Sequence, residues 1–162
     1  LIGNFIMDRI IQDVLINNIS NSDKILDIGC GNKEKTSIFK KENIVSLDAW
    51  DKVNPDVLLD LEKNKLPYEE NSFDVILMID FIEHIDKQRG KELIEECKKI
   101  TRNKIILFTP LIWSDNAVNV NDSKLWCYGN EFDYHKSLWT KDDFKDWFPI
   151  PYNNYFLGIW YK

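Results

Sequence analysis

The chain has 162 residues, of which 44% are hydrophobic and 30% are charged, and its formal net charge at pH 7 is −6. This length predicts one domain spanning residues 1–162, with the composition of an ordinary globular protein. The acidic excess disfavours partners such as nucleic acid or an anionic membrane surface. No apolar run approaches the ~20 residues of a membrane span, and three scattered cysteines form no CxxC pair, so we expect reduced thiols and a cytoplasmic location.

The spacing of apolar residues predicts alternating helices and strands. A helix over residues 5–19 carries an apolar stripe that includes Ile11 and Leu15. The nearly continuous apolar run SFDVILMID is typical of a central parallel strand that is covered on both faces. The expected strands are residues 24–28, 44–47, 57–59, 72–80, 104–110 and 154–162. The other expected helices are residues 37–41 (at most a short one), 87–100 and 141–147.

Strands that alternate with helices predict a doubly wound α/β fold, with a mostly parallel sheet and helices on both faces. The last run, residues 154–162, is the expected antiparallel strand at the C-terminus. Residues 111–139 show little periodicity, and loops of this length are usually lids or binding segments. We therefore expect them to fold over the cofactor as a lid that forms the acceptor pocket. Their aromatic side chains argue against disorder and are Trp113, Trp126, Tyr128, Phe132, Tyr134 and Trp139.

The stretch KILDIGCGN ends an expected strand near Asp27 and continues through Gly29 and Gly31. In a doubly wound sheet, ligands bind at the carboxyl ends of the strands, beside the first turn between strand and helix. Two glycines there let backbone N–H groups face a polar ligand. Asp48 ends the next strand and can accept hydrogen bonds from both hydroxyls of a ribose, and Asp60 can accept one from an adenine amino group. The site therefore predicts a nucleoside with a charged extension.

Two nucleoside cofactors compete for this pattern, a dinucleotide and a sulfonium compound. The dinucleotide fingerprint G-x-G-x-x-G requires a third glycine, but Glu34 stands there and would point at a pyrophosphate. The chain also leaves no room for a separate catalytic domain. A sulfonium cofactor carries an ammonium group and a positive sulfur, which Asp27 and its acidic surroundings favour. The residues thus favour the sulfonium cofactor.

Four segments, taken in order, resemble class I S-adenosylmethionine-dependent methyltransferases of type 11. They are ILDIGCGN, VSLDAW, LLDLEKNKLPYEENSFDVILMIDFIEHI and KIILFTP, and the resemblance covers about residues 25–148. It implies a Rossmann-like fold and S-adenosyl-L-methionine as the cofactor. The chain departs from the family pattern at Lys33, which replaces the third glycine of the usual G-x-G-x-G.

The resemblance also implies which residues contact the cofactor. Asp27 and the two glycines of the turn would line its methionine portion. Asp48 would hold the ribose, and Asp60 with Leu61 would hold the adenine. The full set of expected contacts is Asp27, Gly29, Cys30, Gly31, Asp48, Ala49, Asp60, Leu61 and Asp80.

A second group of polar residues follows the strand 72–80. Asp80, Glu83 and His84 lie at positions i, i+3 and i+4, a spacing that places side chains on one face of a helix. The only other histidine is His135, at the end of the expected lid. Unperturbed imidazole titrates near neutral pH, which suits a general base. Glu83, His84 and His135 are therefore the candidate catalytic residues, acting on a proton of the acceptor.

Two further interpretations of this group stay open. Asp80, Glu83, His84 and His135 could hold a divalent metal such as Mg²⁺ that orients the substrate oxygen. That pattern resembles the metal-dependent O-methyltransferases of quinone biosynthesis and of RNA 3′ ends, in which a distal histidine precedes a stretch like HKSLWTKDDFKDW. Asp80 stands where those enzymes have a glutamate. The same sequence pattern is also similar to that of small-molecule methyltransferases without a metal.

The expected function is transfer of a methyl group from S-adenosylmethionine to an O or N atom of a small or medium-sized acceptor. The alternatives are a non-catalytic cofactor-binding regulatory partner and the metal-dependent O-methyltransferase. The sequence leaves the acceptor and the oligomeric state open.

Overall fold

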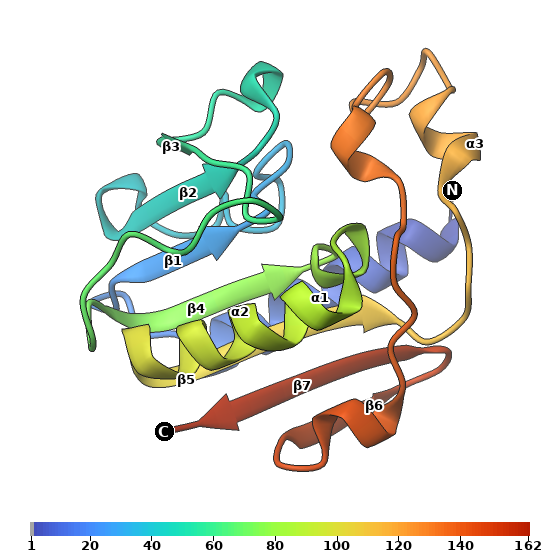
Figure 1. Ribbon diagram of the computed structural model, residues 1–162. Coiled ribbons are helices and arrows are strands. Elements are labelled where there is room, and N and C mark those ends of the chain that lie inside the picture. The colour runs from blue at the N-terminus through green and yellow to red at the C-terminus, as the bar shows by residue number, and fades with distance from the viewer. Residues whose placement is uncertain (1) are drawn as a thin grey trace.

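The centre of the molecule is a twisted sheet (Figure 1). The computed structural model describes residues 2–162, with side chains from Met7 onward, so the Phe5 and Ile6 side chains of the expected first helix lie outside the described part. The strands are β1 (Ile25–Ile28), β2 (Ile44–Asp48), β3 (Val57–Leu58), β4 (Phe73–Ile79), β5 (Thr101–Pro110), β6 (Phe148–Tyr152) and β7 (Tyr155–Tyr161).

The seven strands lie in the order β3-β2-β1-β4-β5-β7-β6. Strands β1 to β5 pair in parallel, whereas β7 runs antiparallel to both β5 and β6. This arrangement confirms the expected doubly wound, Rossmann-like α/β fold with an antiparallel C-terminal strand.

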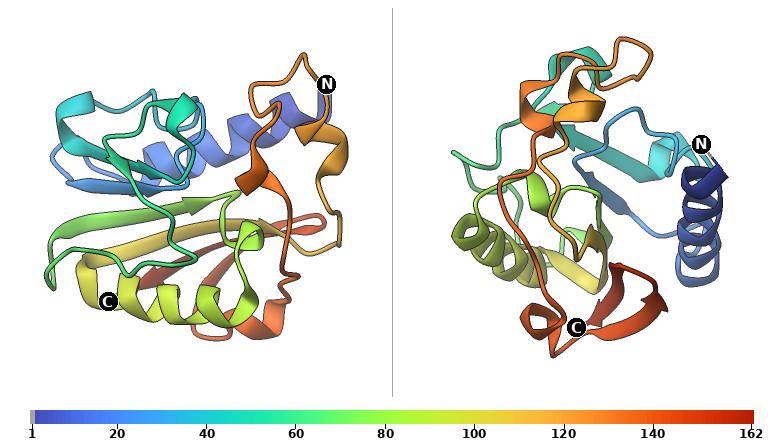
Figure 2. Two further views of the ribbon diagram at one scale, coloured as in Figure 1. Left: turned by 45° about the horizontal axis from the view of Figure 1, so that its top comes forward. Right: turned by 90° about the vertical axis from the view of Figure 1, so that its right-hand side faces the viewer.

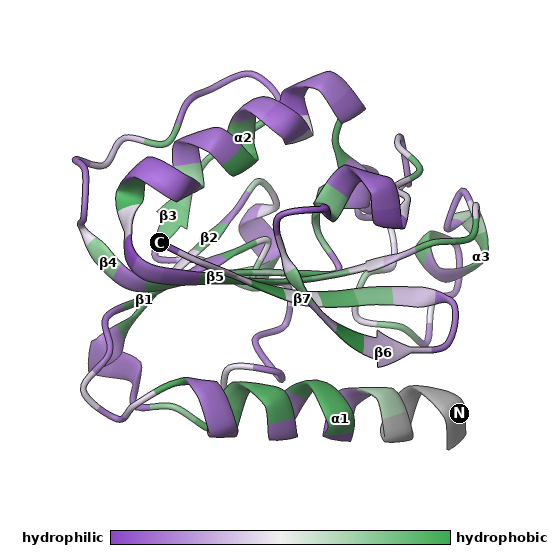
Figure 3. Ribbon diagram, turned by 90° about the horizontal axis from the view of Figure 1, so that it is seen from below, coloured by the Kyte–Doolittle hydropathy of each residue, from purple (hydrophilic) through white to green (hydrophobic). Residues whose placement is uncertain are grey.

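Two long helices cover the two faces of the sheet. Figure 3 shows α1 (Ile2–Asn18) on one side of the strands and α2 (Lys87–Ile100) on the other. The Asp86 carboxylate caps α2 by accepting hydrogen bonds from the Gln88 and Arg89 N–H groups. No described helix is long and apolar enough to cross a membrane. The remaining helical segments are α3 (Ala117–Val120) and the 3₁₀ turns η1 (Lys41–Asn43), η2 (Asp51–Val53), η3 (Ile82–His84), η4 (Glu131–Asp133) and η5 (Lys141–Phe144).

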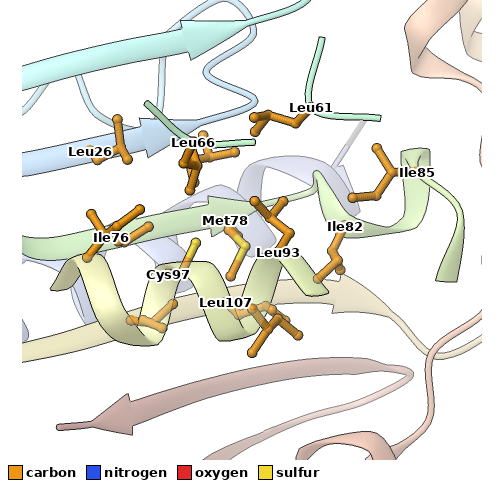
Figure 4. Close-up of a cluster of buried hydrophobic side chains, with 14 of the residues drawn as sticks. Leu26, Leu61, Leu66, Ile76, Met78, Ile82, Ile85, Leu93, Cys97 and Leu107 are labelled. Atoms are coloured by element: carbon orange, nitrogen blue, oxygen red, sulfur yellow. The ribbon is translucent and has the colours of Figure 1, made fainter. Parts of the chain in front are cut away.

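Strand β4 supplies side chains to two separate apolar layers, which explains its continuous apolar run. Ile76 and Met78 join the layer under α2, together with Leu93 of that helix (Figure 4). Val75 and Leu77 belong to the layer under α1. Successive side chains of a strand point to opposite faces, so a strand that is buried on both sides needs apolar residues at both sets of alternate positions.

Several boundaries differ from the sequence expectations. The strand β6 was not among the expected strands, and its sequence FPIPY contains Pro149 and Pro151. A proline donates no N–H group to a neighbouring strand, and β6 tolerates two because it is the edge of the sheet. The expected helix 141–147 is only the 3₁₀ turn η5, capped by Thr140 and Asp143. The expected short helix 37–41 is absent: residues 37–39 form a turn and a bend, and the 3₁₀ turn η1 begins only at Lys41.

Candidate cofactor and acceptor site

A cavity of about 700 Å³ opens at the carboxyl ends of the parallel strands. Its wall comes from the glycine turn after β1, from the ends of β2 to β5 and from residues 111–139. Figures 1 and 2 show this last segment, in gold to orange, standing beside the ends of the strands. All the residues that the sequence singled out line this one cavity, namely Asp27, Gly29, Cys30, Gly31, Asp48, Ala49, Asp60, Leu61, Asp80, Glu83, His84 and His135.

The turn after β1 requires glycine for two reasons. Gly29 and Gly31 have φ angles of +68° and +48°, which favour a residue without a Cβ atom. A Cβ atom at Gly29 would lie 2.3 Å from Cδ2 of Phe81, and one at Gly31 would lie 2.9 Å from the Trp126 ring. The glycines therefore admit two aromatic rings close to the backbone.

The N–H groups of this turn are already used within the protein. Those of Gly29 and Cys30 donate to the carbonyl oxygen of Leu47, at 2.8 and 3.1 Å. That of Gly31 donates to Oδ2 of Asp48 at 3.0 Å. Our expectation that these N–H groups face a polar ligand was therefore wrong. The glycine turn is instead fastened to β2, and these three N–H groups are not free for a ligand.

Lys33, which departs from the family pattern, keeps the backbone conformation of the glycine that it replaces. Its φ angle is +62°, which costs a residue with a Cβ atom roughly 1–2 kcal/mol. Its ammonium group donates to the Asn54 carbonyl oxygen and the side chain does not line the cavity. The substitution therefore leaves the cavity open.

The carboxyl group of Asp27 lies buried at the bottom of the cavity. It accepts a hydrogen bond from the Thr36 hydroxyl at 2.9 Å. Burial raises its pKa to about 6, and the neighbouring Asp48 adds to the rise. A ligand cation at this point would offset both effects, so Asp27 is suited to a positively charged group. Burial also raises the pKa of the Cys30 thiol to about 12, so that thiol is not a nucleophile at neutral pH.

Two further carboxylates stand at the ends of β2 and β3. Each oxygen of Asp48 accepts one backbone hydrogen bond, from Gly31 at 3.0 Å and from Trp50 at 2.9 Å. Asp60 accepts one from the N–H of Glu62 and pairs with Lys63 at 2.8 Å. Burial raises the pKa of Asp60, but these partners outweigh it and the net shift is downward. Carboxylate oxygens retain lone pairs after one hydrogen bond, so both residues can still accept from a ligand.

Asp80 does not share a helix face with Glu83 and His84, as the sequence spacing suggested. It ends β4 with a left-handed φ of +49°, and residues 82–84 form the 3₁₀ turn η3. Its carboxylate pairs with the Lys35 ammonium at 3.1 Å, and Lys35 also lies 3.5 Å from Asp8 of α1. The i, i+3, i+4 pattern failed because the chain turns sharply at the end of β4 before any helix begins.

The other end of the cavity brings together the two histidines. The ring centroids of His84 and His135 lie 4.8 Å apart, although about fifty residues separate them in sequence. Glu83 belongs to the same group, in which one potential ligand atom from each residue lies within 4.8 Å of the others. Asp80 is not part of this group. Backbone N–H groups of Lys136 and Ser137 donate to the Glu83 carbonyl oxygen at 2.8 and 3.0 Å, which holds the two segments together.

The electrostatics of this group run against our expectation. Nearby carboxylates should raise the pKa of an imidazole, yet burial dominates and lowers the pKa of His84 to about 4. Burial also lowers the pKa of His135. Burial and the charge of Asp80 raise the pKa of Glu83 well above its usual range. Burial thus disfavours the charged imidazolium forms of His84 and His135 and the charged carboxylate form of Glu83.

Several residues of the cavity were not singled out by the sequence. Asp133 lies with Oδ1 3.9 Å from Nε2 of His84, and the Thr109 hydroxyl donates to Glu83 at 2.9 Å. Lys35, Phe81 and Trp126 contact expected site residues as described above. Of these residues, only Asp133 could have been proposed from the sequence, because it precedes the candidate residue His135 by two positions. The others are brought to the cavity only by the folding of the chain.

Comparisons with known proteins agree with this geometry. Residues 26–109 match the model of the methyltransferase domain family. The chain is 28% identical to an uncharacterized protein of Methanocaldococcus jannaschii, in a match that covers 100% of this chain and 73% of that one.

Two solved structures show the same fold. One is an S-adenosylmethionine-dependent methyltransferase from Archaeoglobus fulgidus, with a TM-score of 0.63, 15% identity and coverage of 96% of this chain and 94% of that one. The other is the magnesium protoporphyrin IX methyltransferase of Synechocystis with bound S-adenosylhomocysteine, with a TM-score of 0.63, 12% identity and coverage of 98% and 81%.

The family match spans more than half of the chain and contains the glycine turn, the ends of β2 and β3, and the turn that carries Glu83 and His84. The chain belongs to the methyltransferase domain family.

Proposed function

We propose that the protein transfers a methyl group from S-adenosylmethionine to an O or N atom of a small or medium-sized acceptor bound in the cavity. The observation that carries this proposal is the arrangement of the cavity. Carboxylates from the ends of three parallel strands line the same cavity as Glu83, His84 and His135, which lie close to one another. The non-catalytic regulatory partner has no specific observation in its favour.

The residues of the cofactor end divide the binding between them. Asp48 accepts hydrogen bonds from the ribose hydroxyls, with Ala49 beside it, and Asp60 with Leu61 contacts the adenine. Asp27 attracts the ammonium of the methionine portion. Its carboxylate is buried and, among the described residues, forms no ion pair with a lysine or arginine. The remaining contacts of the methionine portion are Gly29, Cys30, Gly31 and Asp80.

The cofactor, when bound, supplies a methyl group that its sulfonium has already activated. The contribution of the protein is therefore alignment of the acceptor, exclusion of water and acceptance of one proton. Glu83, His84 and His135 stand where the acceptor atom would meet the methyl group. Glu83 has the raised pKa, and the neutral imidazoles can accept a hydrogen bond from the acceptor or pass its proton onward.

The direct test is methyl transfer from isotopically labelled S-adenosylmethionine to a panel of small acceptors. We expect incorporation of label into at least one class of O or N acceptor and the release of S-adenosylhomocysteine. A protein that binds the cofactor but labels no acceptor would instead behave as the regulatory partner.

We also propose that residues 111–139 act as the lid of this cavity. Trp113, Trp126 and Phe132 line the cavity, and Trp126 lies against the Gly31 backbone. The last five residues of the segment are anchored to η3, because the Lys136 and Ser137 N–H groups donate to the Glu83 carbonyl oxygen and the Trp139 indole donates to that of Ile82 at 3.3 Å. We therefore expect movement in residues 111–134.

Hydrogen exchange should distinguish these two parts. In the free protein we expect weak protection over residues 111–134 and strong protection of the Lys136 and Ser137 amides, which donate to Glu83. Saturating S-adenosylhomocysteine should raise protection in the first part only. If residues 111–134 are as protected as β4 without any ligand, they are structural and not a lid.

A second candidate function is metal-dependent O-methylation, for which the grouping of Glu83, His84 and His135 is the specific observation. Both imidazoles are neutral, as metal ligands must be, and the residues fit a three-ligand site. Two nitrogen ligands and one carboxylate suit Mn²⁺, Fe²⁺ or Zn²⁺ better than Mg²⁺, which prefers oxygen. The acidic wall of the cavity disfavours an RNA substrate and leaves a small quinone precursor as the fitting acceptor class.

Removal of metal separates the two functions. If methyl transfer is metal-independent, dialysis against EDTA leaves the rate of the untreated protein unchanged, and this is the result that we expect. In the metal-dependent case, EDTA abolishes turnover, and added Mn²⁺ or Mg²⁺ restores it. Cofactor affinity, measured on the same samples, should be unaffected either way.

A further inference from the structure

The charge of the cavity wall carries an inference about the acceptor, and this inference rests on the proposed function. Among the described residues, nine aspartate and glutamate side chains line the cavity, against two lysines. Lys35 is paired with Asp80 and Asp8, and Lys136 is paired with Glu62. Both ammonium groups are therefore already neutralised by carboxylates, and an acceptor that carries a carboxylate or a phosphate would find no free cation to bind it.

Asp133 is a carboxylate of the cavity wall without a cationic partner. It accepts a hydrogen bond from the Asn116 amide at 2.8 Å, and its side chain is only 16% exposed. Among the described residues, no lysine or arginine lies within ion-pair distance of its carboxylate. A cation of the ligand placed beside Asp133 would therefore meet an unpaired negative charge.

An unpartnered imidazole lies beside Asp133 in the same wall. The His84 side chain is 10% exposed, and its Nδ1 has no hydrogen-bond partner among the described residues. Its Nε2 lies 3.9 Å from Asp133 and 4.0 Å from Glu83, which is too far for a direct hydrogen bond. Nε2 therefore faces the two carboxylates, and His84 marks the part of the wall where Asp133 and Glu83 approach the same point.

From these observations we propose that the acceptor is an amine, which binds as a cation at the Asp133 and His84 end of the cavity and is methylated on nitrogen. The ammonium form first loses a proton to a neighbouring base or to water. The lone pair of the neutral nitrogen then forms the N–C bond while the C–S bond breaks and its electrons pass to sulfur. The positive charge thus moves from the sulfonium to the nitrogen, into the acidic end of the cavity, and the carboxylates there stabilise it as it develops. A carboxylate or phenolate nucleophile would be repelled by the same groups.

The charge preference can be measured without knowing the acceptor. Sinefungin is an analogue of S-adenosylhomocysteine in which a carbon bearing an ammonium group replaces the sulfur, so its positive charge lies where the methyl group is transferred. Calorimetry should show that sinefungin binds at least about fivefold more tightly than S-adenosylhomocysteine, because opposite charges several ångströms apart attract appreciably at the edge of a protein. Equal or weaker binding of sinefungin would overturn the inference while leaving the proposed function intact. If neither compound binds, the proposed function itself fails.

Variants test whether Asp133 is the source of the preference. The ratio of the two dissociation constants should fall to within about twofold in Asp133→Asn, because the substitution removes one charge and keeps the shape. Asp142→Asn is the matched control, since Asp142 is 87% exposed on η5, and it should keep the ratio of the unaltered protein. If Asp133→Asn does not fold, Asp133→Ser serves instead, because it removes the same charge with a smaller side chain. A ratio unchanged in the folded variant would contradict the assignment.

A competition experiment then identifies the acceptor atom. Matched aromatic amines, alcohols and carboxylates at equal concentration are incubated with labelled S-adenosylmethionine. Label in the amine fraction supports the inference, and label in methyl esters or ethers contradicts it. If no compound is labelled, the comparison of sinefungin with S-adenosylhomocysteine decides.

Discussion

Replacement of either histidine by alanine is expected to lower the rate of methyl transfer by about 10²- to 10⁴-fold, the range for loss of a residue that handles the proton in the transition state. The ring centroids of His84 and His135 lie 4.8 Å apart in the cavity wall, and the proposed ribose and adenine contacts are other residues, Asp48 and Asp60. The dissociation constant of S-adenosylhomocysteine should therefore stay within about threefold of its original value, since neither imidazole is proposed to touch the cofactor.

The measurement is single-turnover methyl transfer, with calorimetry on the same preparations. Glu70→Gln, an exposed substitution elsewhere on the surface, should change neither quantity and serves as the control. Thermal unfolding of each variant shows whether the fold survives, because His84 and Glu83 are buried. A histidine variant that loses cofactor affinity in parallel with its rate would move that residue to the cofactor end.

The second large effect is expected at the cofactor end. Asp48→Ala should weaken binding of S-adenosylmethionine by about 1.5–3 kcal/mol, the value of charge-assisted hydrogen bonds to two ribose hydroxyls. The same substitution removes the acceptor for the N–H groups of Gly31 and Trp50, so it also loosens the fastening of the glycine turn to β2. Both consequences weaken binding of the cofactor.

Asp51→Ala provides the control for Asp48→Ala. Asp51 is an exposed acid three residues along the chain, and its loss removes the same charge without touching the cavity. Calorimetric titration of both variants with S-adenosylmethionine gives the comparison. Normal affinity in Asp48→Ala would remove the proposed ribose contact.

The cofactor end of the site was readable from the sequence because it depends on local rules. Strand ends, two glycines and the acids that follow each strand are all contiguous signals, and the parallel sheet brings the ends of β1, β2 and β3 to one edge. The sequence could not show that the N–H groups of the turn bond to Leu47 and Asp48, because that depends on the register between β1 and β2.

The acceptor end was readable only in part. His135 could be linked to His84 by resemblance, but their contact depends on hydrogen bonds between residues 136–137 and Glu83. The helix expected from the spacing of Asp80, Glu83 and His84 was wrong because the chain turns at Asp80. The left-handed conformation there has no sequence signature, except that aspartate adopts it more readily than most residues. The direction of the histidine pKa shifts also required the fold, since burial is a property of the packed chain.

Calorimetric comparison of two nucleoside cofactors tests the central claim most directly. Titration of the unaltered protein with S-adenosylmethionine should give a dissociation constant in the micromolar range, on the order of −8 kcal/mol of binding free energy. Titration with NAD should give no measurable heat of binding, because Glu34 lines the cavity and would meet the pyrophosphate with a negative charge. Tighter binding of NAD than of S-adenosylmethionine would contradict the account.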